Sequence, residues 1–317
     1  MSVMAKVFAS FIDTQELAAM LRTGTRVYLL DASYNIPGFN VDIRSGHQNC
    51  RIPGAKFFEV DEIADKSSGF LHMLPTNSVF VDYMKRLRVK NDDNLLVVYD
   101  QLGVVSAPRA WWTFKVFGRT NIAVLNGGLP KWQKEQLPVE SGPYPLYQDS
   151  SSESDSDYHY RLDSSQVYDL KAVTALSRLL SAGLVETQLV DARPEGRFNG
   201  TAPEPRPGVR SGHVPGSLSH FFKNAFNPDG TIKSVPEVKQ SFRAAGICTD
   251  NTARTVHMCG SGMTACINLL AQEYVGKART GVYDGSWTEF VRERQATSTE
   301  PQISEQEMEA YRRLFSS

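Results

Sequence analysis

The stretch TVHMCGSGMTAC, residues 255–266, joins an apolar run that is typical of a buried strand to a run with helical spacing. We predict the second run as a helix over 265–275, in which Ile267, Leu270 and Tyr274 share one face. The small, uncharged residues between the two runs predict a tight turn that leads into the helix N-terminus. Cys259 stands at the first position of that turn.

The position of Cys259 is more typical of a reactive cysteine than of a cysteine packed in a core. Amide N–H groups of the turn and the positive end of the helix dipole favour an anion, and therefore favour the thiolate of the cysteine. An unpaired cysteine is more commonly a packed core residue. Two glycines and a serine beside Cys259, however, suit an anion-binding loop better than a core. We therefore interpret Cys259 as a nucleophile.

Composition and charge limit the class of protein. A chain of 317 residues predicts two domains, and 34 basic against 35 acidic residues give a net charge of -1. This balance provides no electrostatic basis for binding nucleic acid or an anionic membrane, so we expect neither partner. No apolar run approaches the roughly 18 residues that a membrane span needs. Because the N-terminus lacks the zones of a signal peptide, we expect a cytoplasmic protein, with a mitochondrial location as the alternative.

The cysteines predict neither a metal centre nor a disulfide framework. Cys50, Cys248, Cys259 and Cys266 lack both metal-ligand and C-x-x-C spacing. Reduced thiols in a reducing compartment are the better interpretation. We expect no metal and no organic cofactor.

The two halves of the chain repeat one pattern of motifs. Apolar runs, Pro-Gly turns and glycine-containing turns occur in the same order in both. From Pro53 to Asp100 is 47 positions, and from Pro215 to Cys259 is 44. Spacings this similar indicate a duplication. In each half, short apolar runs alternate with longer periodic segments, which predicts an α/β domain with a mostly parallel sheet flanked by helices.

Pattern and composition divide the chain into four segments: a first α/β domain over 1–140, a linker over 141–157, a second α/β domain over 158–295 and a helical tail over 296–317. The linker combines turn formers with acidic residues and has too little apolar surface for a core. One helical face of the tail is expected to dock on the second domain, and it carries Ile303, Met308, Tyr311 and Leu314.

In the register of the repeat, Cys259 corresponds to Asp100 of the first half. A carboxylate is not a soft nucleophile toward sulfur, so we expect the cysteine chemistry in the second domain alone. A parallel-sheet domain places such a residue at the carboxyl end of a strand, where ligands bind in α/β folds.

Three segments and the tandem repeat resemble the mercaptopyruvate sulfurtransferases of the rhodanese superfamily: Cys259 to Thr264, Ser106 to Trp112, and Tyr283 to Trp287. The likeness extends over nearly all of residues 8–292. It implies two tandem rhodanese-like domains, the first non-catalytic and the second catalytic. In this superfamily, rhodaneses proper carry basic residues after the cysteine, whereas the mercaptopyruvate enzymes carry Gly-Ser-Gly or Gly-Thr-Gly. The present loop has the second pattern.

The resemblance implies roles for individual residues. Arg197 and Arg206 match the substrate-binding segment, where they are expected to hold the carboxylate and keto oxygen of mercaptopyruvate. Asp61 and His72 match segments that form a relay to Ser261, which is expected to stabilise the developing enolate or to help deliver a proton. The remaining loop residues are expected to bind substrate: Gly260, Gly262, Met263 and Thr264.

The implied activity moves sulfur from 3-mercaptopyruvate through a Cys259 persulfide to an acceptor thiol or cyanide, and releases pyruvate. Thioredoxin or small thiols are the acceptors that the resemblance implies. Two alternatives stay open: a thiosulfate:cyanide sulfurtransferase and a non-catalytic sulfur-carrier module. A cysteine phosphatase is disfavoured, because Ala265 stands where its phosphate loop needs an arginine.

Three positions depart from the family pattern. Met263 replaces the usual valine, Arg51 replaces a histidine that often precedes the first Ile-Pro-Gly, and the segment 100–105 is shorter and lacks an aromatic residue. Met263 is close to valine in volume, so the loop is expected to stay intact. The shortened segment is expected to affect substrate affinity and acceptor choice rather than the chemistry.

Overall fold

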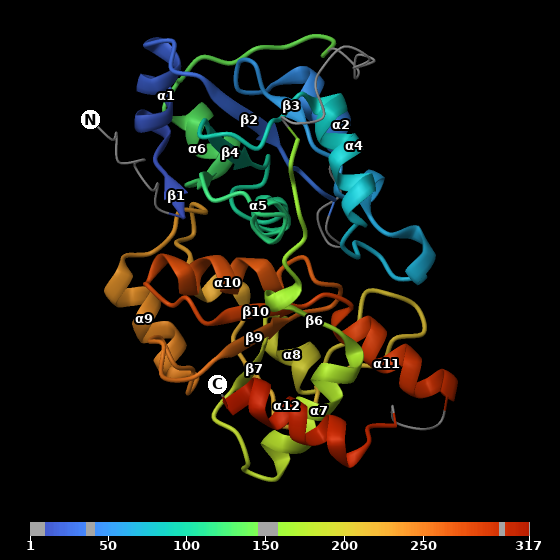
Figure 1. Cartoon of the computed structure of the whole chain (residues 1–317). Helices are drawn as coiled ribbons and strands as arrows, with labels where there is room; N and C mark the ends of the chain where they lie inside the picture. The colour runs from blue at the N-terminus through green and yellow to red at the C-terminus, as the bar shows by residue number, and fades with distance from the viewer. Residues whose placement is uncertain (1–9, 36–41, 145–157, 298–301, 317) are drawn as a thin grey trace, which may run out of the picture. The chain divides into compact units, whose positions relative to one another are not determined.

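The computed structural model describes residues 10–35, 42–144, 158–297 and 302–316. The chain divides into two compact units (Figure 1). Unit 1 comprises Met1–Asp65, Leu74–Asp163 and Pro228–Ile232, and unit 2 comprises Lys66–Met73, Ser164–Asn227 and Lys233–Ser317. Each unit is built on a five-stranded sheet with helices around it, which confirms the predicted α/β class.

The sheet of unit 1 has the strand order β1-β5-β4-β2-β3, and its strand pairs are parallel. The strands are β1 Phe11–Ile12, β2 Val27–Asp31, β3 Lys56–Phe57, β4 Leu95–Tyr99 and β5 Ile122–Leu125. The helices are α1 Thr14–Arg22, α2 Ile43–Asn49, α3 Val60–Ile63, α4 Asn77–Leu87, α5 Ala107–Val116 and α6 Gly128–Lys134.

Unit 2 repeats this topology, with the order β6-β10-β9-β7-β8 and parallel pairs. Its strands are β6 Val167–Tyr168, β7 Gln188–Asp191, β8 Leu218–Ser219, β9 Thr255–Met258 and β10 Thr280–Tyr283. Its helices are α7 Leu170–Ser181, α8 Glu195–Phe198, α9 Val235–Ala244, α10 Ala265–Tyr274, α11 Ser286–Thr297 and α12 Glu305–Ser316. The longer periodic segments of the sequence include 79–87, 171–180 and 236–245, and these correspond to α4, α7 and α9.

Strand register confirms the duplication. Asp31 of β2 pairs with Tyr99 of β4, and Asp191 of β7 pairs with Met258 of β9. Asp100 and Cys259 each follow directly after the second partner of these pairs. They therefore occupy equivalent strand ends in the two units, as the sequence spacing predicts.

Helices cover both faces of the unit 2 sheet. Leu189, Val256, Met258 and Tyr283 belong to a core cluster with apolar residues of α7, α11 and α12. α10 contacts β9 and β10, and Figure 1 shows it on the other side of the sheet from α7 and α12. Since both faces are covered, β9 is buried along its whole length, as expected of a central parallel strand.

The C-terminal helix α12 packs on unit 2, as predicted for the tail. Phe315 joins the core cluster, and Met308 and Tyr311 pack against it. One residue of the prediction was wrong, because Leu314 is 40% exposed. The buried face follows residues 308, 311 and 315 at intervals of three and four, which leaves Leu314 about a quarter turn away from it.

The compact units differ from the predicted domain bounds in three places, one of which is Pro228–Ile232, expected in the second domain but grouped with unit 1. Residues 158–163, expected in the second domain, group with unit 1. Their aromatic residue Tyr160 is buried edge-on against Phe80, and the Arg161 amide donates to the Phe117 carbonyl oxygen. Lys66–Met73, expected in the first domain, groups with unit 2. Most of the expected linker and the start of the expected tail lie outside the described residues.

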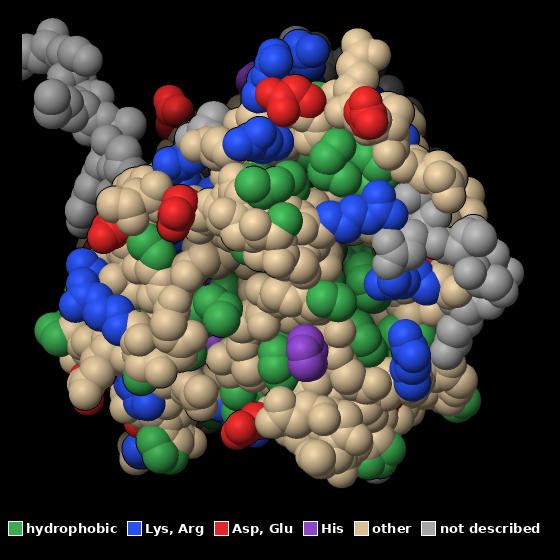
Figure 2. Space-filling model, turned by 90° about the horizontal axis from the view of Figure 1, so that it is seen from below, with side chains coloured by type: hydrophobic (Ala, Val, Ile, Leu, Met, Phe, Trp, Pro, Cys, Tyr) green, Lys and Arg blue, Asp and Glu red, His purple; other side chains and the backbone are tan. Residues whose placement is uncertain are grey.

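The surface agrees with the near-zero net charge. On the face shown in Figure 2, basic and acidic side chains are interspersed and apolar side chains form small separate groups. Among the helices that the structure describes, none is long and apolar enough to span a bilayer.

Candidate active site

Cys259 follows β9 and is buried, with 2% of its surface exposed. The loop after it ends at Ala265, the first residue of α10, as the sequence predicts. Gly262 has φ of 77°, in the left-handed region that favours glycine. Within the described residues, the amides of the other loop positions donate to no acceptor: Gly260, Ser261, Met263 and Thr264. These N–H groups are therefore available to an anionic sulfur on Cys259.

The first turn of α11 fixes the backbone of this loop. Ser286 Oγ accepts hydrogen bonds from the amides of Cys259 at 3.1 Å and Gly262 at 3.0 Å. Thr288 donates both its amide and its hydroxyl to the Gly260 carbonyl oxygen. Ser286 is fully buried and has φ of 54°, which costs a non-glycine residue about 1 kcal/mol. The two loop amides at its hydroxyl oxygen give a reason for that conformation.

Two predicted arginines converge on the loop. A Cβ atom built at Gly260 would lie 3.1 Å from Arg197 Nη2 and 3.2 Å from Arg206 Nη1. Arg206 Nη2 donates to Ser261 Oγ at 2.9 Å. A side chain at position 260 would therefore crowd both guanidinium groups, which would have to move by a few tenths of an ångström. Two cationic groups thus lie next to the cysteine loop, which itself carries no cation.

Glu204 orients Arg197. Its carboxylate is 1% exposed and accepts hydrogen bonds from Arg197 Nε at 2.9 Å, from Arg197 Nη2, and from Arg193 Nη1 at 2.8 Å. Arg193 also binds Asp191, the last residue of β7. Burial lowers the pKa of Arg193, but Asp191 and Glu204 outweigh burial and raise the pKa overall. A buried ionic chain therefore connects a strand end to the arginine beside the loop.

We expect Glu204→Gln to lower the free energy of unfolding by about 3 kcal/mol, because it removes the buried counter-charge of Arg197 and leaves Arg193 with Asp191 alone. Urea denaturation measures the change. Glu195→Gln is the matched control, since Glu195 is exposed in the same segment and should shift stability by less than about 0.5 kcal/mol. Equal stability of the two variants would contradict the role assigned to Glu204.

The residues of the predicted relay belong to different compact units. Asp61 lies on α3 in unit 1, whereas His72 is buried in a segment that groups with unit 2. The hydrogen bond at Ser261 Oγ comes from Arg206. His72 has φ of 65°, an uncommon value for a residue with a side chain. The relay through Asp61 and His72 to Ser261 therefore stays a prediction.

The sequence patterns predict no role for Glu204, Ser286 or Thr288. Glu204 lies between Pro203 and Pro205 in the segment that carries Arg206. Ser286 lies between Gly285 and Trp287. Their functions depend on partners far away in the chain, since Ser286 is 27 residues from Cys259. The glycine-serine motif after a strand is the signal that could have pointed to Ser286 as a loop support.

The arrangement suits attack by sulfur on a small anionic substrate. Cys259 can supply a nucleophile, and the loop amides without an acceptor can stabilise negative charge on its sulfur. Arg197 and Arg206 can hold a carboxylate next to the loop through charge-assisted hydrogen bonds. Such a site favours a molecule that carries sulfur and carboxylate a few bonds apart.

Known proteins share this organisation. A family model described as a rhodanese-like domain matches residues 13–135 and again residues 172–293. The 3-mercaptopyruvate sulfurtransferase of Mus musculus is 36% identical over 290 residues, which cover 90% of this chain and 93% of that protein. The thiosulfate sulfurtransferase of Gallus gallus is 38% identical over 271 residues, which cover 85% of this chain and 88% of that protein.

A solved structure shows the same similarity at the level of the fold. SseA from Escherichia coli, a 3-mercaptopyruvate sulfotransferase with the rhodanese fold, is 30% identical and superimposes with a TM-score of 0.74. The match covers 89% of this chain and all of that one. Since the family pattern occurs once in each half and the two sheets share one strand order, the chain belongs to the rhodanese-like family.

Proposed function

We propose that this protein is a sulfurtransferase that takes sulfur from 3-mercaptopyruvate onto Cys259 and passes it to a thiol or to cyanide. The observation that carries the proposal is the convergence of Arg197 and Arg206 on Gly260, beside a cysteine loop without a cation of its own. In 3-mercaptopyruvate the carboxylate lies apart from the sulfur. The cations that bind the carboxylate must therefore lie apart from the cysteine that attacks the sulfur. Relatives named 3-mercaptopyruvate sulfurtransferase support the same donor.

The first half-reaction forms the persulfide. The Cys259 thiolate attacks the donor sulfur, a sulfur–sulfur bond forms, and the carbon–sulfur bond of the donor breaks. The electron pair of the broken bond becomes the enolate of pyruvate, and a proton released from the persulfide balances the proton that the enolate takes. Arg206 and Ser261 lie where they can stabilise the enolate oxygen.

The second half-reaction returns the thiolate. An acceptor thiolate or cyanide attacks the outer sulfur of the persulfide, and Cys259 leaves with the electron pair of the sulfur–sulfur bond. Thioredoxin and small thiols are the acceptors we propose. The loop amides that can stabilise negative charge on Cys259 also favour its departure as a leaving group.

Thiosulfate:cyanide sulfur transfer is the second candidate, because a relative named thiosulfate sulfurtransferase is as similar as the mercaptopyruvate enzymes. Steady-state kinetics of the unmodified protein with both donors distinguishes the two. A higher kcat/KM for mercaptopyruvate supports the first proposal, and a higher value for thiosulfate supports the second. A persulfide on Cys259 without turnover of either donor would indicate a non-catalytic sulfur carrier.

We expect Arg197→Ala and Arg206→Ala each to lower kcat/KM for mercaptopyruvate, mainly by raising KM, because a charge-assisted hydrogen bond to the carboxylate is lost. The loss of kcat/KM should correspond to about 1.5 to 3 kcal/mol of transition-state stabilisation. Initial rates at varied donor concentration measure the effect. Arg312→Ala, an exposed change on α12, is the control and should leave kcat/KM unchanged. A loss no greater than that of the control would remove both arginines from the donor site.

We propose a cytoplasmic location, with the mitochondrion as the alternative. An Arabidopsis thaliana relative that is 38% identical over 271 residues is named as mitochondrial. Fractionation of cells that express the full chain with a C-terminal tag tests the proposal.

A further inference from the structure

Trp287 connects the cysteine loop to the arginine segment, residues 193–212. It lies in the first turn of α11 and is buried, with 2% of its surface exposed. Its amide donates to the Cys259 carbonyl oxygen at 3.0 Å, and its indole Nε1 donates to the Arg210 carbonyl oxygen at 2.7 Å. One residue thus holds the cysteine loop through its backbone and the arginine segment through its side chain.

The indole ring also supports Arg193. The guanidinium carbon of Arg193 lies 4.6 Å from the ring centre, which is a cation–π distance. Arg193 Nη2 donates to the Gly212 carbonyl oxygen at 2.6 Å, and the Gly212 amide donates to the Arg197 carbonyl oxygen at 3.0 Å. A Cβ atom built at Gly212 would lie 3.6 Å from Cζ2 of the indole, so the backbone of the arginine segment passes next to the ring.

These contacts continue to the arginine beside the loop. Arg193 and Arg197 share the Glu204 carboxylate, and Arg197 lies next to Gly260. A displaced indole would move Arg193, and with it the carboxylate that orients Arg197. Misplacing a group at a reacting centre by 1 Å can cost about 100-fold in rate. The spacing between the cysteine loop and this arginine therefore depends on the indole.

The burial of Trp287 has a separate cause. Trp287 belongs to the apolar cluster of unit 2 and stacks on Phe290, with ring centroids 5.8 Å apart. A buried indole N–H needs an acceptor in any core. The guanidinium on its ring and the acceptor it uses are what connect it to the arginine segment.

We propose that Trp287 is a positioning residue for sulfur transfer, whose indole keeps Arg197 at the distance from Cys259 that a carboxylate-bearing donor requires. Phe290 contributes to the same core without this role. The proposal rests on the proposed function, since it takes Arg197 as part of the carboxylate site.

Alkylation of Cys259 tests the proposal without using sulfur transfer. Iodoacetate and iodoacetamide each form a carbon–sulfur bond with the thiolate and release iodide, but only iodoacetate carries a carboxylate. Mass spectrometry of the full chain, digested after timed exposure to each reagent, gives both rate constants at Cys259. We expect iodoacetate to react at least about tenfold faster, because Arg197 holds its carboxylate near the sulfur.

The two Trp287 variants should change the ratio of these rate constants. Trp287→Leu, which removes both indole contacts, should lower the ratio at least about tenfold. Trp287→Phe keeps a ring for Arg193 but loses the N–H, and should lower the ratio by about threefold to fivefold. The rate constant for iodoacetamide should stay within about twofold in both variants, because the backbone of residue 287 still binds the Cys259 carbonyl oxygen.

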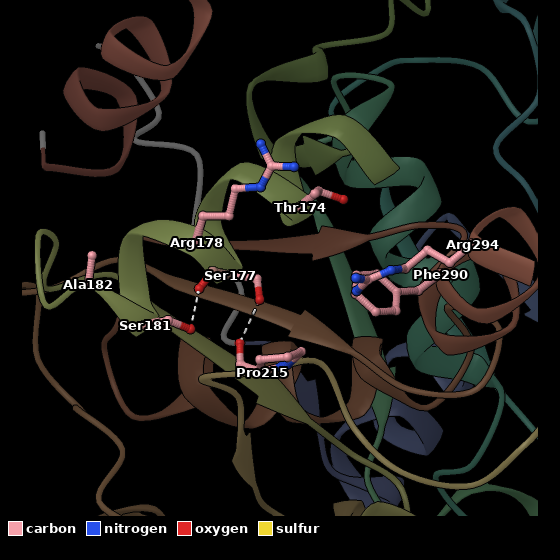
Figure 3. A pocket seen from close by; sticks show the side chains of 8 residues that line it. All are labelled: Thr174, Ser177, Arg178, Ser181, Ala182, Pro215, Phe290 and Arg294. Atoms are coloured by element: carbon pink, nitrogen blue, oxygen red, sulfur yellow. Dashed lines mark hydrogen bonds between the residues drawn. The ribbon is translucent and has the colours of Figure 1, made fainter. Parts of the chain in front are cut away.

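Phe290→Leu is the matched control for core packing. Phe290 is as buried as Trp287, and its side chain points into a hollow that α7 lines from the other side (Figure 3). Its loss should lower the melting temperature but keep the ratio within about twofold. A fall of both rate constants in Trp287→Leu without a change in their ratio would overturn the proposal. If Trp287→Leu does not fold, a ratio in Trp287→Phe equal to that of Phe290→Leu would overturn it.

Arg197→Ala separates this proposal from the proposed function. It should lower the ratio at least about tenfold, because the contact with the carboxylate is lost directly. An unchanged ratio in Arg197→Ala would overturn the carboxylate site and the positioning role together. A lowered ratio in Arg197→Ala with an unchanged ratio in both Trp287 variants would overturn the positioning role alone.

Discussion

Cys259→Ser is expected to lower kcat/KM for sulfur transfer by at least about 10⁴, with little change in stability. A serine hydroxyl is nearly as small as a thiol but stays protonated at neutral pH, so it cannot attack the donor sulfur. The backbone of Cys259 keeps its hydrogen bonds in the variant, because Ser286 and Trp287 bind its amide and carbonyl groups rather than its sulfur. The loop should therefore fold normally around an inactive side chain.

Mass spectrometry and kinetics together test this expectation. After incubation with mercaptopyruvate, the unmodified protein should gain one sulfur atom at Cys259, and the serine variant should gain none. Cys50→Ser, Cys248→Ser and Cys266→Ala are the matched controls, and each should retain activity. An equally inactive variant among these controls would require a second essential cysteine. Turnover by Cys259→Ser would remove Cys259 from the mechanism.

The central elements of both units could be predicted because their sequences carry unambiguous periodicity. β4 is the unbroken apolar run Leu95–Tyr99, and α7 has a strongly one-sided apolar pattern. The edge strands β1, β3, β6 and β8 were not predicted, since two residues are too few to show a period. Their membership of a sheet depends on backbone pairing with distant strands, which local sequence does not encode.

In the candidate active site, too, the residues with local sequence signals could be predicted and those that depend on distant partners could not. The cysteine loop could be located because glycine spacing, a strand and a helix are local signals. Arg197 and Arg206 were assigned through family likeness, and geometry now places both beside Gly260. Glu204 and Ser286 escaped prediction because buried ionic and hydroxyl contacts depend on how separate segments pack. Leu314 was misassigned for a related reason, since only the docked helix decides which neighbour faces the core.

Asp100→Ala is expected to lower the free energy of unfolding by about 4 kcal/mol, because it empties a buried ring of amide donors. Asp100 Oδ2 accepts hydrogen bonds from the amides of Val105 at 2.8 Å, Ser106 at 2.9 Å and Ala107 at 2.9 Å. Oδ1 accepts one from Leu102 at 2.9 Å. Burial raises the pKa of Asp100, and these amide hydrogen bonds oppose the rise.

The amide ring shows what stands in the first unit at the position of the cysteine of the second. Asp100 follows β4 at the position that Cys259 occupies after β9, and in both units the loop leads into a helix. In unit 1 the protein's own carboxylate satisfies the loop amides, whereas in unit 2 several loop amides remain available to a sulfur anion. The first loop thus has an anion-binding form whose amides are satisfied by a side chain of the protein itself.

Chemical rescue separates this account from ordinary core disruption. Formate is a carboxylate small enough to enter the space left by the missing side chain, so it should raise the melting temperature of Asp100→Ala in proportion to the logarithm of its concentration. Asp82→Ala, an exposed change on α4 of the same unit, should lose less than about 0.5 kcal/mol and show no formate response beyond that of sodium chloride. Equal stabilisation of Asp100→Ala by formate and by sodium chloride would contradict this account. It would mean that the loop amides do not form a site that a separate carboxylate can fill.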